Sequence, residues 1–422
     1  MDKVFLDSSY SMGRPSLLVR SENMELIDYY DKDSGNSISS IKNLCLALDI
    51  NESELDEISQ LGDDRYVKSE VPKSSGGVRI VYNPHRTLRK VQRRINNRIF
   101  NPKSGAIIRW PSFIYGSIPN QHLLHGELEH KDYVACVKNH CLRSSILKVD
   151  VQDFFNNIHI DHVVEIFTSF FKYPDDVSNC LAELCCYKDF VVQGALTSSY
   201  IASLCLFDVE PDVVRRVKRK GLVYTRLVDD ITISSMDRDY DFSYVKSLVI
   251  DMLHEKDLPV NVEKTNVFRV SEGPLLVHGL RISFQEPRLP ADEISRIRAS
   301  VKNVERLASE PKFRTTHAYR QDYNRCMGRV NKLKRVGHNQ HKKLTERLLK
   351  VHPKPSKKDL KRIKVMISTL ERDYEKKGDN YWFYKRFYRA QERLNLIAKS
   401  YPNYVNKLRP RLKKVFPNYD KS

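Results

Sequence analysis

The sequence predicts an α+β chain that ends in a basic helical extension. Between residues 146 and 285, short apolar runs rich in β-branched residues alternate with segments of helical periodicity. From about 291 to 350, and again from 356 to 398, the composition is helical and basic, and Pro353 and Pro355 mark a linker between the two stretches. With 422 residues, of which 41% are hydrophobic, the chain can form two or three domains with cores of their own.

The part before residue 146 is expected to contain helices around one β-hairpin. Residues 1–37 have weak periodicity and are predicted to form a poorly ordered leader. The run IKNLCLALDI predicts an amphipathic helix, and Asn51 with Glu54 has the capping-box spacing that opens a second one. The run YVKSEVPKSSGGVRIVYNP predicts a hairpin that turns at its two glycines. The next segment, HRTLRKVQRRINNRIF, predicts a helix with one apolar face and several arginines, among them Arg93 and Arg94.

Three runs in the α/β part carry most of the structural signal. SILKVDVQDFFNNI predicts a strand that runs into a turn, and GLVYTRLVDDITISS predicts a hairpin of two apolar strands that meet at Asp229-Asp230. LTSSYIASLCLFDVEPDVVRRVK predicts one long helix between them. Residues 356–398 predict two basic helices, and residues 400–422 are interpreted as a tail that contains proline and tyrosine.

The positive charge is concentrated at the C-terminal end. The net charge is +19, and residues 354–422 hold 20 Lys or Arg against 7 Asp or Glu. Such a balance favours polyanions, although a solvated helix face explains many single basic runs. In NYWFYKRFYRAQERLNLIAK a stripe of apolar residues predicts core packing. The other face is a candidate for gripping single-stranded nucleic acid, with Tyr384 and Tyr388 beside Lys385, Arg386 and Arg389.

Targeting signals and cysteine usage indicate a cytoplasmic protein. No stretch approaches the roughly 18 apolar residues that span a bilayer, and the N-terminus lacks the apolar segment of a secretory signal. The eight cysteines form no CxxC pair, and most lie in apolar surroundings. We therefore expect no membrane association, no disulfide framework and no structural zinc.

Three aspartates interrupt apolar β-runs. Asp150 ends one strand in LKVDVQDFF, and Asp229 and Asp230 lie between RLV and ITI. Adjacent carboxylates repel each other unless a cation lies between them, and oxygen ligands suit Mg²⁺. Two Mg²⁺ ions held by these residues would provide the two-metal clamp used in phosphoryl transfer. A plain turn is the alternative for an isolated Asp-Asp pair; two apolar-flanked sites some 80 residues apart favour the metal site.

The order of these motifs is similar to that of bacterial reverse transcriptases of the retron and group II intron lineage. The resemblance covers roughly residues 40–350 and rests on VPKSSGGVRIVYNPHRTLRKVQRRI, VDVQDFFNNI, VVQGALTSSYIASLCLFDVE, YTRLVDDITIS, NVEKTNVF, LLVHGLRIS and RCMGRVNKLKRVGHNQHKKLTERL. It implies a right-hand polymerase fold in five parts: a leader (1–37), fingers with N-terminal helices (38–145), a palm (146–285), a helical thumb (286–352) and a basic helical C-terminal extension (353–422).

The resemblance also implies a role for individual residues. Asp150 and Asp229 would hold both metals, with Asp230 assisting and Val151 as a further ligand. The dNTP site would be formed by Lys73, Arg79, Asp153, Phe155, Gln193 and Gly194. Phe155 matches the steric gate that selects dNTPs, although apolar patterning alone also fits a core position. Lys264 would lie near the departing pyrophosphate, with a solvated loop lysine as the alternative. His278 and Gly279 match the primer grip, and Arg93 and Arg94 would bind nucleic acid.

Three departures from the retron pattern shape the expected subclass. The stretch HKDYVACVKNHCLRSSILKVD lacks Asn-Ala-x-x-His, Val277-His278-Gly279 replaces VTG, and Leu227 replaces an aromatic residue. These departures favour the unknown-group enzymes that bacteria use against phage. The implied activity is RNA-directed DNA synthesis on a bound, non-coding RNA, with dNTPs as substrates, DNA as product and a partner protein or a second copy as possible companions. A retron enzyme that makes RNA-linked single-stranded DNA and a non-catalytic nucleic-acid-binding scaffold remain the alternatives.

Overall fold

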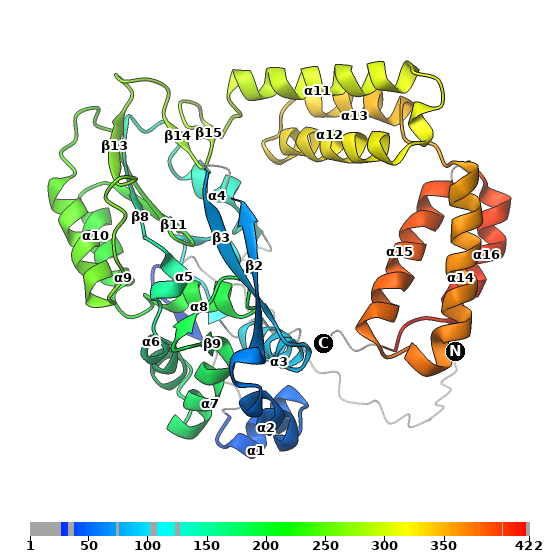
Figure 1. The fold of residues 1–422 in the computed structure, drawn as a ribbon. Coiled ribbons are helices and arrows are strands. Elements are labelled where there is room, and N and C mark those ends of the chain that lie inside the picture. Colours follow the sequence, from blue (N-terminus) through cyan, green and yellow to red (C-terminus); the bar gives the residue numbers. More distant parts are fainter. Residues whose placement is uncertain are drawn as a thin grey trace, which may run out of the picture.

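The computed structural model describes residues 27–32, 38–72, 76–101, 108–122, 127–398 and 400–418. Its buried apolar residues form three separate clusters, which run from Tyr30 to Leu258, from Val137 to Leu348 and from Ile363 to Val415. In Figure 1 the first part lies on the left, the second at the top right and the third on the right. Within the described residues, no helix is long and apolar enough to cross a membrane.

A five-stranded sheet supports the three aspartates. Its strand order is β13 (Asn266–Arg269), β8 (Ser145–Asp150), β12 (Asp230–Ser235), β11 (Val223–Leu227) and β5 (Ile114–Tyr115). All neighbours are antiparallel except β11 and β5. Ile146, Leu147 and Val149 are buried, as expected for a central strand. The predicted hairpin of β11 and β12 is therefore confirmed, and β8 lies beside it.

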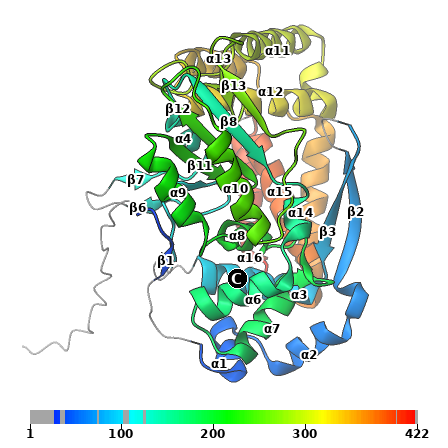
Figure 2. The same ribbon diagram turned by 90° about the vertical axis from the view of Figure 1, so that its left-hand side faces the viewer.

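Helices cover the sheet and pack below it. α9 (Glu210–Arg219) and α10 (Ser243–Glu255) lie side by side in front of the sheet in Figure 2. The remaining helices of this part are α4 (Tyr133–Lys138), α5 (Phe154–Asn157), α6 (Ile160–Glu165), the π-helix η3 (Ile166–Phe170), α7 (Asp175–Cys185) and α8 (Ser198–Leu204). The prediction of one long helix over LTSSYIASLCLFDVEPDVVRRVK is wrong, because α8 ends at Leu204 and α9 begins again at Glu210, with Pro211 in its first turn.

The N-terminal part projects a β-ribbon from a helical base. α1 (Ile41–Leu48) and α2 (Glu52–Gln60) come first, and the capping box of Asn51 and Glu54 is confirmed. A short 3₁₀ turn, η1 (Gly62–Arg65), leads into the ribbon of β2 (Tyr66–Pro72) and β3 (Val78–Pro84). α3 (Arg86–Ile95) continues into the π-helix η2 (Asn96–Phe100). Its predicted apolar face is buried at Leu88, Val91, Ile95 and Ile99.

Part of the expected leader packs against the core. Residues 1–26 and 33–37 lie outside the described residues, whereas β1 (Asp31–Lys32) pairs with β4 (Ile108–Arg109). Tyr30 is only 8% exposed and donates its hydroxyl to Glu210. The leader prediction therefore does not hold for residues 27–32. The remaining short strands are β6 (Gln121–His122), β7 (Leu128–Glu129), β9 (Cys186–Tyr187), β10 (Phe190–Val191), β14 (Leu276–Val277) and β15 (Leu280–Arg281).

Two helical bundles follow the sheet. The first contains α11 (Ala291–Ser309), the short η4 (Phe313–Thr315), α12 (His317–Arg335) and α13 (Gln340–Lys350). The second contains α14 (Lys357–Lys377), α15 (Tyr381–Ala398) and α16 (Pro402–Lys414). The interpretation of residues 400–422 as a tail is wrong for α16. The 3–4 spacing of Val405, Leu408 and Leu412 gives this helix a buried face, which outweighs the internal Pro410.

Candidate active site

The structure brings Asp150, Asp229 and Asp230 to one end of the sheet. Asp150 is the last residue of β8, and Asp230 is the first residue of β12. These two residues are direct partners in the antiparallel register. Asp229 lies in the turn before β12, and its carbonyl oxygen accepts a hydrogen bond of 3.4 Å from the Val151 amide. Two strands distant in sequence therefore place three carboxylates together.

The carboxylates influence one another electrostatically. Burial, together with repulsion from Asp229 and Asp150, raises the pKa of Asp230 to about 6. Burial is also the main cause of the raised pKa of Asp229. The positive charges of Lys264 and Arg79 act in the opposite direction on Asp229. The site thus contains negative charge that nearby cations stabilise.

Lys264 is the cation in direct contact with the carboxylates. Its Nζ donates to Oδ2 of Asp150 at 3.1 Å, although the lysine side chain is 67% exposed. This hydrogen bond is the main cause of the raised pKa of Lys264. Lys264 thus lies in a turn beside Asp150 with its side chain largely exposed, and its role near the departing pyrophosphate stays a prediction.

A cleft of about 920 Å³ opens in front of the aspartates. Phe155 is half-buried and lines it, whereas Phe154 is 2% exposed in the core. The other predicted site residues that line the cleft are Arg79, Asp150, Val151, Asp153, Gln193, Asp229 and Lys264. Lys73 lies outside the described residues. The cleft therefore collects residues from the ribbon, from the turn after β8 and from the loop before α8.

Gly194 connects that loop to the ribbon. The Tyr82 amide donates to the Gln193 carbonyl at 2.8 Å. A Cβ atom at Gly194 would lie 2.5 Å from the Tyr82 carbonyl oxygen and 2.7 Å from Cγ1 of Val81, and its φ is +113°. Only glycine fits this close approach, so Gly194 positions Gln193 and the ribbon relative to each other.

His278 and Gly279 form the turn between β14 and β15. Both have positive φ, 45° and 78°, as the two central residues of a type I′ turn require. Nδ1 of His278 lies 3.7 Å from Oδ2 of Asp230. Burial lowers the pKa of His278 to about 4, so the ring is neutral at neutral pH. This turn therefore contacts the rim of the acidic site.

A buried ion pair, which the sequence analysis did not predict, lies beneath the aspartate turn. Arg226 and Glu210 are 1% and 0% exposed, and they form two hydrogen bonds of 2.7 and 2.8 Å. Arg226 also donates to the Val228 carbonyl at 3.1 Å. Tyr30 and Tyr224 complete the surroundings of Glu210. Because Arg226 lies three residues before Asp229, this network fixes the base of the turn; the one signal in the sequence was an arginine inside an apolar strand.

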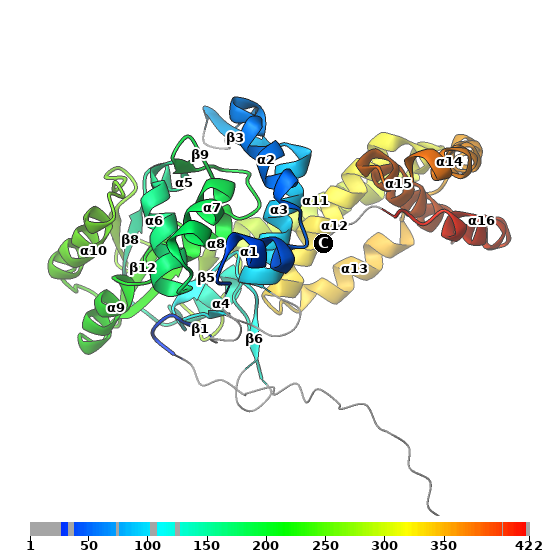
Figure 3. The same cartoon turned by 90° about the horizontal axis from the view of Figure 1, so that it is seen from below.

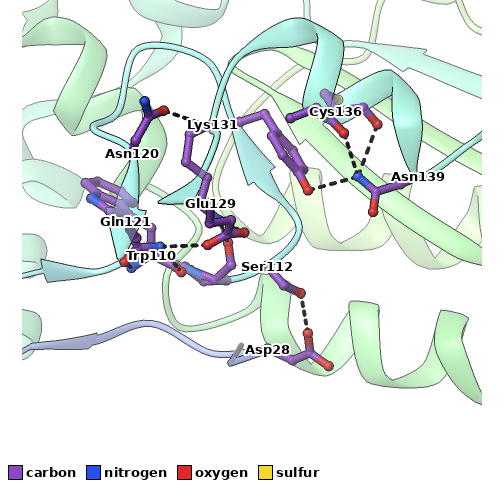
Figure 4. A network of polar contacts seen from close by, with 12 residues as sticks. Asp28, Trp110, Ser112, Asn120, Gln121, Glu129, Lys131, Cys136 and Asn139 are labelled. Carbon is purple, nitrogen blue, oxygen red and sulfur yellow. Dashed lines mark hydrogen bonds and ion pairs between the residues drawn. The ribbon is translucent and has the colours of Figure 1, made fainter. Parts of the chain in front are cut away.

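Figure 4 shows a polar network around Lys131 in the segment before β8. Lys131 is 1% exposed, and its Nζ donates to the Pro111 carbonyl at 2.8 Å and to Glu129 at 2.6 Å. Its carbonyl accepts from the amide of Gly116, the residue after β5. Since β5 pairs with β11 at Leu227, the network holds the strand that borders Val228.

The remaining predicted nucleic-acid contacts differ in accessibility. Arg94 is 3% exposed, pairs with Asp49 at 3.1 Å and donates to the backbone carbonyls of Leu48 and Asp49. Its position thus serves packing between α1 and α3, and we do not include it in the proposed interface. Arg93 is half-buried on α3. Arg386 pairs with Asp373 of α14 at 3.1 Å, whereas Lys385 and Arg389 are exposed on α15.

The acidic site fits divalent cations chemically. Within the described part of the chain, no three His, Cys, Asp or Glu side chains already converge as metal ligands. However, the donors are carboxylate oxygens, which Mg²⁺ prefers, and burial together with their mutual repulsion raises the pKa of Asp230. A bound cation would relieve that repulsion.

Comparison with known proteins is consistent with this geometry. A family model described as reverse transcriptase (RNA-dependent DNA polymerase) matches residues 71–307. The Retron Ec48 reverse transcriptase of Escherichia coli is 44% identical over 399 residues, 94% of this chain and 97% of that protein. The Retron Se72 reverse transcriptase of Salmonella heidelberg (strain 579083-10) is 30% identical over 339 residues, 79% of this chain and 85% of that protein.

A solved structure of telomerase from Candida albicans covers 85% of this chain and 68% of its own, with 11% identity and a TM-score of 0.39. A similarity this low carries no argument. The two bacterial relatives correct the expected subclass, because both are retron enzymes. The altered Asn-Ala-x-x-His and VTG motifs therefore do not separate this chain from retrons.

Proposed function

Because this chain belongs to the retron family of reverse transcriptases, which are RNA-dependent DNA polymerases, we propose that it copies a bound non-coding RNA into single-stranded DNA. The observation that carries the proposal is the register of β8 and β12. It sets Asp150 opposite Asp230, with Asp229 in the adjoining turn. Asp150 and Asp229 line the cleft, and Asp230 lies beside them. This carboxylate set suits phosphoryl transfer better than any binding role.

Asp150, Asp229 and Asp230, with the Val151 carbonyl, would hold two Mg²⁺ ions. Bound there, the ions would supply Lewis-acid activation of the primer 3′-hydroxyl and charge neutralisation on the triphosphate. Arg79 lines the cleft and would bind the triphosphate together with Lys73. Lys264 beside Asp150 is our candidate for protonating the departing pyrophosphate.

The walls of the cleft would select and align the substrates. Phe155 faces the space in front of Asp150 and would exclude a ribose 2′-hydroxyl, and Asp153 lines the same turn. Gln193 would line the nucleotide site, fixed by the close approach of Gly194 to the ribbon. The turn of His278 and Gly279 beside Asp230 would hold the primer terminus.

This assignment divides the chain as in a right-hand polymerase. We propose that residues 38–145 form the fingers, 146–285 the palm, 286–352 the thumb and 353–422 an additional basic domain. By family association, the DNA product would remain linked to RNA and would serve phage defence. The intact carboxylate set argues against a non-catalytic scaffold. The function of such a scaffold would not require neighbouring carboxyl groups that raise the pKa of Asp230.

The nucleic acid that accompanies the protein tests this proposal. Full-length wild type and Asp150→Asn are purified from cells, and their bound nucleic acid is sequenced with and without RNase and DNase. We expect one structured RNA with both proteins, and DNA that shortens on RNase treatment with the wild type alone. DNA of the same sequence with Asp150→Asn would refute the assigned site. RNA of random sequence would refute a dedicated template.

A further inference from the structure

We propose that helix α15 is a binding surface for an unpaired strand of the bound RNA. This inference rests on the proposed function for the identity of the ligand. Its structural basis is independent of the active site, because it lies in the C-terminal bundle of α14, α15 and α16.

The two faces of α15 differ in character. Phe383, Phe387, Ala390, Leu394 and Ile397 are at most 4% exposed and form the core of the bundle. On the outside, Trp382 is 63% exposed, Tyr388 is 38% exposed and Tyr381 is 36% exposed. Large aromatic side chains on a surface require a reason, since burial would stabilise them.

Cations accompany these rings. Nζ of Lys385 lies 5.2 Å from the centre of the Trp382 ring and 5.9 Å from that of Tyr381. Arg389, one turn further along, is exposed, and the rings of Tyr384 and Tyr388 lie 4.5 Å apart. Alternating rings and cations along one helix face fit the bases and phosphates of a nucleic acid strand. We call this surface the aromatic stripe: Tyr381, Trp382, Tyr384, Lys385, Tyr388 and Arg389.

The stripe faces the part of the molecule that contains the sheet. In Figures 1 and 3, α15 is the helix of the bundle nearest to the rest of the molecule, and α16 lies on the far side. Because α15 buries its apolar face against its two partners, its outer face points toward that part.

The far end of the bundle also approaches the base of the fingers. Asp379 and Asn418 line one cleft of about 620 Å³ together with His85 and Lys90 of the α3 region. The bundle thus ends beside α3, and a template strand that reaches the active site would pass near the bundle.

Charge and shape together select the ligand. The 20 Lys or Arg against 7 Asp or Glu in residues 354–422 favour a polyanion over a protein partner of ordinary charge. Exposed rings stack on bases only where the bases are free of a duplex. A DNA strand offers similar chemistry; we assign the stripe to RNA because RNA is the bound template of the proposed function.

Fluorescence anisotropy with full-length protein and a labelled 20-nucleotide oligouridine tests the proposal at several salt concentrations. Trp382→Ala is expected to weaken binding about tenfold without changing the salt dependence, because stacking carries no charge. Lys385→Ala with Arg389→Ala is expected to lower the slope of log K against log salt by about 1.4, or 0.7 for each phosphate contact. Lys361→Ala with Lys364→Ala, on the exposed face of α14, removes the same charge and should leave the slope unchanged.

Three comparisons make the result decisive. Oligothymidine and a 20-base-pair RNA–DNA hybrid replace the RNA as probes, and synthesis on oligo(dT)-primed poly(rA) checks the polymerase. We expect the loss of affinity in Trp382→Ala to be largest for oligouridine, and the α14 control should keep synthesis within twofold of wild type. A larger loss for the hybrid or for oligothymidine would overturn the assignment, as would equal losses in the α14 control. Asp229→Asn should bind oligouridine like wild type, so failure of catalysis and failure of the stripe are separate results.

Discussion

A Cβ atom on Gly116 would lie 2.8 Å from Cγ2 of Val228, the residue before the two central aspartates. Val228 itself has a φ of 61°, which is rare for a β-branched residue. The network of Lys131 holds Gly116 in place, and Arg226 holds the Val228 carbonyl. The conformation of the aspartate turn therefore depends on a contact with Gly116, a residue more than 100 positions earlier in the chain.

This contact predicts a strong effect of Gly116→Ala. The added methyl group meets Val228 and is strained at a φ of +118°, so we expect a loss of about 1–3 kcal/mol of unfolding free energy. We also expect a decrease of at least about tenfold in kcat from displacement of the turn. Chemical denaturation and steady-state synthesis measure the two effects. Gly328→Ala is the control, since nothing lies within 4 Å of its Cβ position in α12. Normal activity of Gly116→Ala would show that the contact between Gly116 and Val228 has no role in catalysis.

Phe155→Val tests sugar selection. Removing the ring would admit a ribose 2′-hydroxyl and lower the preference for dNTP over rNTP, measured as the ratio of kcat/KM values, by roughly 10- to 100-fold. Phe154→Leu is the matched control: Phe154 is buried, so stability decreases by about 1 kcal/mol while selectivity stays the same. An unchanged ratio in Phe155→Val would assign Phe155 to the core alone.

Lys264→Met tests the role of the lysine beside Asp150. If Lys264 protonates pyrophosphate, kcat for synthesis and for pyrophosphorolysis should both fall about 100-fold, with KM for dNTP little changed. Lys264→Arg keeps the positive charge, but arginine is a poor proton donor. This variant should therefore keep the wild-type structure while kcat stays low. Equal rates in wild type and Lys264→Met would show that Lys264 is a solvated lysine that does not protonate pyrophosphate.

Asp230 predicts an unusual pH dependence of stability without metal. Its folded pKa, about 6, is above the usual value of 3.8, so the folded state binds the proton more tightly than the unfolded state. The resulting stabilisation is complete below pH 4 and is lost as pH rises through 6. Asp230→Asn should therefore raise Tm in EDTA at pH 8 and have little effect at pH 4. The Asp230 side chain is 52% exposed, and screening by solvent therefore reduces the expected change in Tm.

The same carboxyl predicts how metal acts on stability. Mg²⁺ binds the ionised form, so the rise in Tm on adding Mg²⁺ should diminish below pH 6. Asp56→Asn, on the exposed face of α2, is the control for removing one carboxylate. A constant difference between Asp230→Asn and wild type from pH 4 to pH 8 would contradict the raised pKa.

The sequence predicted those features in which local pattern and final structure agree. The apolar runs around Asp150 and Asp229 required strands, and polar residues at their ends marked a shared edge. The capping box of Asn51 and Glu54 depends on two residues only three positions apart and was equally predictable.

Features that depend on distant partners were not predictable in this way. No local pattern connects Arg226 to Glu210, or Gly116 to Val228, since these contacts exist only once the sheet has formed. Pro410 argued against a helix at α16, and the apolar face of this helix is buried only by its packing against α14 and α15. Arg93 and Arg94 are adjacent and chemically alike, yet helix geometry turns Arg94 into the core. The retron subclass was missed because the prediction relied on a few short motifs, whereas the similarity to retron enzymes extends along almost the whole chain.

The central claim is that Asp150, Asp229 and Asp230 form a metal-dependent site for copying RNA into DNA. Its most direct test is incorporation of labelled dNTP on the co-purified RNA, with Mg²⁺ or EDTA, by wild type and by Asp229→Asn of equal Tm. We predict incorporation by the wild type that requires Mg²⁺, and a rate at least about 10³-fold lower for Asp229→Asn. Equal incorporation by the two proteins, or incorporation in EDTA, would contradict the account.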